Sequence, residues 1–179
     1  MRCRQTTILV CPLSQVAYQI ALHKPARVIT LLDPEFPFPE LGPSFAGKHL
    51  QLRFHDAHLP AENQVLPSVE HVAQLRDFLT ARSSNETLLI HCRAGIGRSP
   101  AAAFIAACYL NPNVSEQKIA AALRRAAPHA RPNETLIHLA DRLLARDGRM
   151  IAAISNTDRN LPWPHITEGE AFHLPCTYQ

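Results

Sequence analysis

Residues 90–99 (IHCRAGIGRS) carry the side chains whose types and spacing could do chemistry. An apolar run ends at Cys92, two glycines follow, and an alanine-rich apolar segment starts at Arg98. Glycines let the backbone curl so that successive N–H groups face one point, and a helix start adds its own unpaired N–H groups. This pattern predicts an anion-binding cradle whose positive potential favours the thiolate form of Cys92.

Arg98 lies six residues after Cys92 and can bind two oxygens of a phosphate at once. A thiolate beneath a bound tetrahedral oxyanion, aligned by an arginine, is a nucleophile for phosphoryl transfer. The alternative is a structural cysteine in an ordinary strand-to-helix turn. We favour catalysis, because the joint pattern of strand, Cys, two Gly, Arg, Ser and buried helix is far rarer than any of its parts.

Such a reaction also needs a general acid that protonates the leaving oxygen and then activates water. The best candidate is Asp56 in the segment LRFHDAHLP, and the alternative is that Asp56 is an exposed loop residue. Asp33 is a weaker rival, because Asp-Pro after a strand is ordinarily a turn. His55 and His58 flank Asp56 and could be read as metal ligands or as groups that tune the acid or contact the substrate. A thiolate–arginine mechanism uses no metal, so we expect neither a metal nor a cofactor.

The segments around this site alternate between strand and helix patterns and then become purely helical. We therefore expect an α/β fold: a mostly parallel central sheet flanked by helices, with a C-terminal helical cluster and the site at the carboxyl end of the sheet. One domain over residues 1–154 should be followed by an extended tail, 155–179, that either packs over the domain or is mobile. Strands are expected at 6–11, 26–32, 48–54 and 87–91, and helices at 13–23, 67–81, 98–110, 115–125, 133–146 and 147–154.

Composition excludes several other classes of protein. Hydrophobic residues make up 46% of the 179 residues and charged residues 18%, which is typical of a globular chain. The apolar runs are shorter than the ~20 residues that a membrane-spanning helix needs. The net charge of +3 comes without a basic, aromatic-rich stripe, so no nucleic-acid partner is expected. The five cysteines are scattered and form no CxxC pair, and the apolar stretch near the N-terminus is too short for a secretory signal. Both observations favour a cytoplasmic location.

HCRAGIGRS resembles the HCxxGxxR(S/T) signature of the cysteine-dependent protein-tyrosine phosphatases, and its surroundings are most similar to the compact dual-specificity branch. The segments PLSQVAYQIALHKPARVITLLDP, LLIHCRAGIGRSPAAAFIAACYL and RPNETLIHLADRLLARDGRM resemble small bacterial proteins of the tyrosine phosphatase family. The resemblance covers roughly residues 10–155 and implies a phosphatase-type fold.

The resemblance also implies a role for each site residue. A phosphocysteine would form on Cys92 and be hydrolysed by water, while Ser99 would hydrogen-bond the leaving thiolate and His91 would hold the loop in shape. Asp56 lies 36 residues before Cys92, an interval similar to that of the family, but the family's Trp-Pro-Asp is absent, so the acid loop could be more fixed. The phosphoryl oxygens would be bound by Arg98 and by the backbone N–H groups of Arg93, Ala94, Gly95, Ile96, Gly97 and Arg98.

The expected substrate is a phosphorylated protein with a phosphotyrosine-like group, or a small phosphomonoester. Loop 34–47 is a candidate wall of the pocket. A phosphoinositide or inositol phosphatase is an alternative, although such enzymes tend to carry lysines in the loop, and only Arg93 accompanies Arg98 here. A non-catalytic phosphate-binding module is a second alternative. We expect Asn133 to cap a helix and Cys108 to lie in the core. The sequence does not place Cys3, Cys11 or Cys176 near Cys92, so a disulfide that protects the nucleophile is left unassigned. Trp163 is expected to be a packing residue, and the alternative is a contact with a partner.

Overall fold

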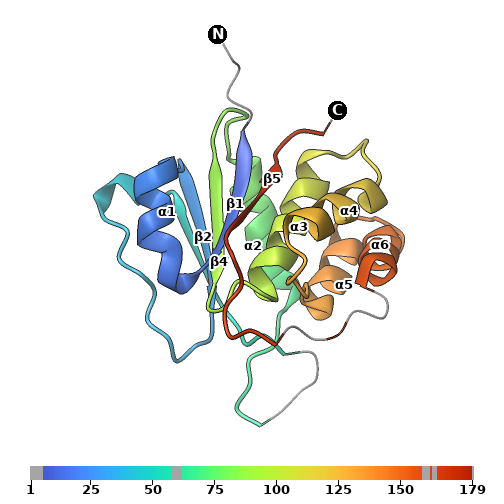
Figure 1. The fold of residues 1–179 in the computed structure, drawn as a ribbon, viewed down its shortest axis with the longest axis horizontal. Helices are drawn as coiled ribbons and strands as arrows, with labels where there is room; N and C mark the ends of the chain where they lie inside the picture. Colours follow the sequence, from blue (N-terminus) through green and yellow to red (C-terminus); the bar gives the residue numbers. More distant parts are fainter. Residues whose placement is uncertain (1–5, 58–61, 159–161, 163–164, 179) are drawn as a thin grey trace.

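The computed structural model describes residues 6–57, 62–158, 162 and 165–178, and a five-stranded sheet runs through its centre (Figure 1). The strands are arranged in the order β3-β2-β4-β1-β5; the first four are parallel to their neighbours, and β5 is antiparallel to β1. This confirms the expected mostly parallel sheet. The strands are β1 (Thr7–Pro12), β2 (Arg27–Leu32), β3 (His49–Arg53), β4 (Leu88–Cys92) and β5 (Phe172–Pro175).

Helices cover both faces of the sheet. The short helix η1 (Leu13–Gln15) leads into α1 (Val16–His23), which covers one face together with the short helix η2 (Pro43–Phe45). The other helices of the described residues form a larger layer on the opposite face (Figure 1). Because both faces are covered, the central strands are continuous apolar runs rather than alternating ones. The larger layer is made of α2 (Val69–Thr80), α3 (Arg98–Leu110), α4 (Glu116–Ala126), α5 (Glu134–Leu143) and α6 (Arg149–Asp158).

Helix α3 is the central element of this layer and follows directly from the site loop. Its residues from Arg98 to Cys108 are all buried, as the alanine-rich apolar sequence indicates. Small side chains let the sheet and the neighbouring helices approach α3 from all sides. The helix start that faces the site is therefore fixed by packing along the whole length of α3.

The C-terminal segment differs most from the expectation. Helix α6 runs to Asp158, beyond the expected boundary at residue 154, and residues 172–175 form β5 instead of a tail without regular structure. Alternation of buried Phe172 and Leu174 with exposed His173 suits an edge strand, but four residues are too few to predict one alone. Cys3, His58 and Trp163 lie outside the described residues.

Within the described part of the chain, none of the helices is both long enough and apolar enough to cross a membrane.

Candidate active site

The loop of residues 93–97 joins the last residue of β4, Cys92, to the first residue of α3, Arg98. Gly95 has a φ of +73°, in the left-handed region that favours glycine. A Cβ at Gly95 would also lie 3.0 Å from the backbone nitrogen of Pro12. The tight curl of the loop against β1 therefore requires a glycine at this position.

Backbone N–H groups from several separate segments hold the outer side of this loop. In a trans peptide the carbonyl and the N–H point in opposite directions, so a carbonyl bound on the outside directs its N–H inward. The sequence gives no sign of these donors, because they come from distant parts of the chain. The bonds are Leu13 N to Arg93 O (3.1 Å), Gly169 N to Ala94 O (2.8 Å), Arg131 N to Ile96 O (2.7 Å) and Asn133 N to Gly97 O (3.2 Å).

The Cys92 sulfur lies inside the curl of the loop and is buried. The backbone N–H of Gly95 donates to Sγ over 3.2 Å, and the Ser99 hydroxyl oxygen lies 3.1 Å from Sγ. Both groups can therefore donate a hydrogen bond to the sulfur. Ser99 thus occupies the place from which it can serve a leaving thiolate.

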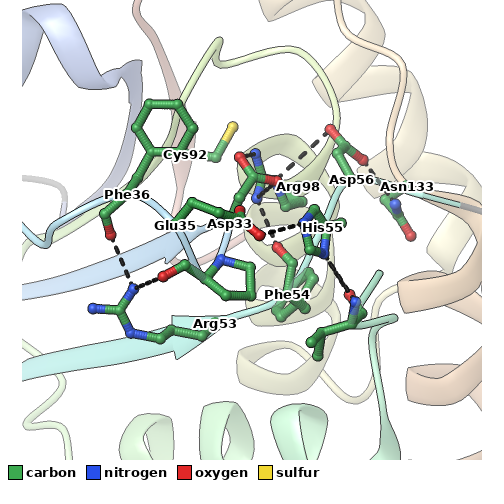
Figure 2. A network of polar contacts seen from close by, with 12 residues as sticks. Asp33, Glu35, Phe36, Arg53, Phe54, His55, Asp56, Cys92, Arg98 and Asn133 are labelled. Carbon is green, nitrogen blue, oxygen red and sulfur yellow. Dashed lines mark hydrogen bonds and ion pairs between the residues drawn. The ribbon is translucent and has the colours of Figure 1, made fainter. Parts of the chain in front are cut away.

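Arg98 is held firmly along one edge of its guanidinium (Figure 2). Its Nη1 and Nη2 donate to the two carboxylate oxygens of Asp33 at 3.1 and 3.2 Å, and Nη1 also donates to the Phe54 carbonyl at 2.7 Å. The remaining Nε is buried and has no hydrogen-bond acceptor among the described residues. That arrangement leaves an oriented donor ready for an oxyanion in the loop.

Asp56 lies over the same loop, close to Arg98 (Figure 2). One of its carboxylate oxygens accepts a 2.7 Å hydrogen bond from the side chain of Asn133, and the other is 3.9 Å from Arg98 Nε. A Cβ at Gly97 would overlap the Asp56 carboxylate, so the second glycine makes room for this residue. The structure thus brings Asp56 to the loop, whereas it pairs the rival Asp33 with the guanidinium of Arg98.

Asn133 has two roles at once. Its side-chain oxygen accepts from the backbone N–H of Leu136 at 2.9 Å, which is the helix N-cap expected for α5. Its side-chain NH₂ donates to Asp56, a contact that sequence reasoning missed. The Pro-Asn pair before an amphipathic helix indicated only the cap.

His91 is fully buried behind the loop. Its Nε2 lies 2.7 Å from the Thr30 hydroxyl, which is also 2.7 Å from Nε2 of His49. Burial lowers the pKa of His91 to about 4, so the ring is neutral at physiological pH. These contacts tie β4 to β2 and β3, which suits the loop-shaping role expected of His91.

His55 is engaged away from the Cys92 loop. Its Nδ1 accepts from the backbone N–H of Val65 at 2.9 Å, which leaves the proton on Nε2, 3.2 Å from Glu35. Among the residues that the structure places, no group of three or more His, Cys, Asp or Glu side chains is arranged to hold a metal ion.

The loop after β2 reaches the 93–97 loop through Phe36. The guanidinium of Arg93 lies over the Phe36 ring, 4.3 Å from its centroid. Arg53 stacks in the same way on Phe38 at 3.9 Å and donates to the carbonyls of Pro34 and Phe36. These contacts fix the start of the 34–47 loop beside the cradle (Figure 2).

Cys11 lies on β1, beside the end of β4 that carries Cys92, but its side chain belongs to the other face of the sheet. It pairs with His91 across β1 and β4 and packs in the cluster beneath α1, whereas Cys92 packs in the larger core. Burial raises the pKa of Cys11 to about 12, which makes it an unreactive thiol at neutral pH. Cys108 lies in the buried part of α3, as expected.

Comparison with known proteins gives a family model and several solved structures. The model described as "Swiss Army Knife protein, DSP-PTPase phosphatase domain" matches residues 27–143. No curated protein matches the chain.

Three of the similar solved structures illustrate the range of the fold. The Yvh1 phosphatase domain from Chaetomium thermophilum is 19% identical over 80% of this chain and 93% of that chain, with a TM-score of 0.53. The human tyrosine phosphatase-like serine/threonine/tyrosine-interacting protein is 19% identical over 76% and 87%, with a TM-score of 0.55. PTPMT1 is 17% identical over 82% and 97%, with a TM-score of 0.52. At these identities the likeness is one of fold.

Proposed function

Since this chain belongs to the family of dual-specificity-type protein-tyrosine phosphatase domains, we propose that it hydrolyses phosphomonoesters through a phosphocysteine on Cys92. The observation that carries the proposal is the convergence of three groups on one loop. The Cys92 sulfur accepts from the Gly95 N–H, and Arg98 presents a buried Nε that has no hydrogen-bond acceptor among the described residues. Asp56 lies 3.9 Å from that Nε.

In the first step the loop N–H groups and Arg98 would bind the phosphoryl oxygens, and the Cys92 thiolate would attack phosphorus. The S–P bond forms as the P–O ester bond breaks, and Asp56 gives its proton to the leaving oxygen. In the second step Asp56 takes a proton from water, the water oxygen bonds to phosphorus, and the S–P bond breaks. Ser99, whose oxygen is 3.1 Å from Sγ, would donate to the departing thiolate.

The charges around the site favour a substrate with a single phosphate of the phosphotyrosine type. The carboxylate of Asp33 lies next to Arg98, where a second phosphate would meet like charge. Arg93 is stacked on Phe36, which places an aromatic ring beside the cradle. These contacts speak against a polyphosphorylated inositol ring and favour an aryl phosphate.

Two alternatives remain as competing proposals. PTPMT1 has been solved in complex with PI(5)P, so the same fold is compatible with a phosphoinositide ligand in that protein. The similar human protein is named a phosphatase-like, serine/threonine/tyrosine-interacting protein. A module that binds phosphate without hydrolysing it is therefore the second alternative. Against that module, this chain has Cys92, Arg98 and Ser99 in place around one loop.

We expect p-nitrophenyl phosphate turnover without added metal to be lost in Cys92→Ser. Asp56→Asn should lower kcat about 10²-fold and remove the basic limb of the pH profile, because the amide cannot give up a proton. Unchanged turnover in Cys92→Ser would contradict the thiolate mechanism. A wild type that binds phosphate but turns over no ester would favour the binding module.

The substrate class is tested with two substrates and one variant. A phosphotyrosine peptide should be hydrolysed with a higher kcat/KM than phosphatidylinositol phosphate in mixed micelles. Arg93→Ala should weaken the peptide reaction, because it removes a cation that lies on Phe36 beside the cradle. A reversed preference in wild type would favour the phosphoinositide alternative.

A further inference from the structure

The segment before β5 is brought to the phosphate-binding loop by the topology of the sheet. Strand β5 is antiparallel to β1, with Phe172 opposite Val10 near the carboxyl end of β1. The residues that precede Phe172 must therefore pass the carboxyl edge of the sheet, where the 93–97 loop lies. In Figure 1 the red segment before β5 runs down alongside β1 towards that edge.

Gly169 makes the contact. Its N–H donates to the carbonyl oxygen of Ala94 over 2.8 Å, and the residue is buried. A Cβ at this position would lie 2.5 Å from the ring of His129 and 3.1 Å from the carbonyl oxygen of Gly95. The approach of the tail to the loop thus depends on the absence of a side chain at residue 169.

The bonded carbonyl belongs to the peptide group whose N–H faces the nucleophile. The peptide between Ala94 and Gly95 accepts from Gly169 on the outside and donates to Cys92 Sγ at 3.2 Å on the inside. Carbonyl and N–H are antiparallel in a trans peptide, and a bond to the oxygen strengthens the donor at the nitrogen. Gly169 is therefore one peptide group away from the Cys92 sulfur.

The tail is anchored on both sides of Gly169. Before it, the carboxylate of Glu168 accepts from the Ser14 hydroxyl at 2.8 Å. After it, Phe172 and Leu174 are buried in the core, and Cys176 N donates to Thr6 O at 3.0 Å. These bonds fix the position from which Gly169 reaches the loop.

We propose that residues 165–178 are a working part of the active site and that Gly169 is a positioning residue for the peptide that donates to Cys92. The expected effect of Gly169 on turnover rests on the proposed function. The family model ends at residue 143, so the donor to Ala94 comes from a segment outside the matched domain. The contact with the loop is thus made by a segment that lies C-terminal to the matched phosphatase domain.

The test is Gly169→Ala in the full chain, with two readouts. We expect kcat/KM for p-nitrophenyl phosphate to fall about tenfold or more, because small displacements of a catalytic group are costly. The pH profile for alkylation of Cys92 by iodoacetamide should move to higher pH, because a misplaced Gly95 N–H stabilises the thiolate less. The alkylation readout does not depend on turnover.

Gly148→Ala is the matched control. Gly148 has a φ of +81°, open space around its Cα and a place before α6, so alanine there strains the backbone without touching the loop. This variant should lose thermal stability and keep the wild-type alkylation profile. If Gly169→Ala behaves like Gly148→Ala, with a lower Tm alone, the positioning role is wrong.

A rescue separates the clash from a general loss of structure. In the double variant Gly169→Ala/His129→Ala the ring is gone and only the 3.1 Å approach to the Gly95 carbonyl oxygen is left, so kcat/KM should rise from that of Gly169→Ala towards that of His129→Ala. Wild-type kcat/KM and alkylation in Gly169→Ala would overturn the proposal. Equal turnover by wild type and Cys92→Ser would instead overturn the proposed function, and the alkylation profiles would still test Gly169.

Discussion

His91 links the shape of the loop to the stability of the fold. It precedes the nucleophile and contacts Thr30 from β2, which in turn contacts His49 from β3. A neutral ring satisfies these contacts, whereas a charged ring would be buried without a counter-ion among the contacts that the structure gives it. The core behind the site is therefore built for an uncharged histidine.

This burial predicts a dependence of stability on pH. The pKa of His91 is lowered from 6.5 to about 4 in the folded protein by burial, so between these values the unfolded chain binds the proton first. The free energy of unfolding should lose up to about 3 kcal/mol from this residue as the pH falls from about 6.5 to about 4. Denaturant titrations of wild type and His91→Gln measure this, and the variant should show the shallower slope. Equal slopes would contradict the assignment.

Among the elements, the start of α5 acts on the site as well as on its own helix. Asn133 caps α5 with its oxygen and holds Asp56 with its NH₂ group. The residues just before α5 also donate two backbone N–H groups to the 93–97 loop, one from Arg131 and one from Asn133. The start of helix α5 thus contacts both Asp56 and the 93–97 loop.

Substitutions at Asn133 separate these two effects. Asn133→Ser keeps a capping hydroxyl but has no NH₂ group for Asp56, so kcat should fall several-fold with little change in Tm. Asn133→Ala should show the same kcat loss and cost about 1 kcal/mol of stability in addition. Steady-state kinetics and thermal unfolding of both variants provide the measurement. A wild-type kcat in Asn133→Ser would show that Asp56 needs no such support.

At the scale of the whole molecule, the buried carboxylate of Glu116 joins elements of the helical layer through ion pairs with Arg146 and, at 3.8 Å, with Arg149. Arg146 donates to Glu116 at the start of α4 over 3.2 Å and to the carbonyl of Cys108 in α3 over 3.0 Å. The Glu116 side chain is only 4% exposed. Removal of one partner leaves the other as an uncompensated buried charge.

Glu116→Gln should therefore lower the free energy of unfolding by about 3 kcal/mol. The exposed pair Arg76–Asp77 offers the matched control, since Asp77→Asn should cost less than about 1 kcal/mol. Activity per folded molecule at low temperature should be unchanged in both variants, because neither pair touches the loop. Urea unfolding and steady-state kinetics of both variants measure these effects. A loss of activity in folded Glu116→Gln would contradict the purely structural role of this ion pair.

The sequence by itself determined the elements and the loop. Short apolar runs between turn residues predicted three of the parallel strands, and the alternation of apolar and polar residues over 48–54 predicted the fourth. Helical periodicity predicted the helices that cover them, because these patterns reflect local hydrogen bonds and burial. The loop was readable because nucleophile, glycines and arginine are adjacent in the chain. The sheet topology confirms the expected fold, and the family model confirms the family.

Only the tertiary structure decided which distant groups complete the site. The pairing of Asp33 with Arg98, the contact of Asn133 with Asp56 and the bond from Gly169 to Ala94 join residues far apart in the chain. Strand β5 exists because β1 offers it an edge, which its four residues cannot signal alone. A one-dimensional pattern records which residues lie inside, whereas the partner of each polar atom is set by how strands and helices meet in space.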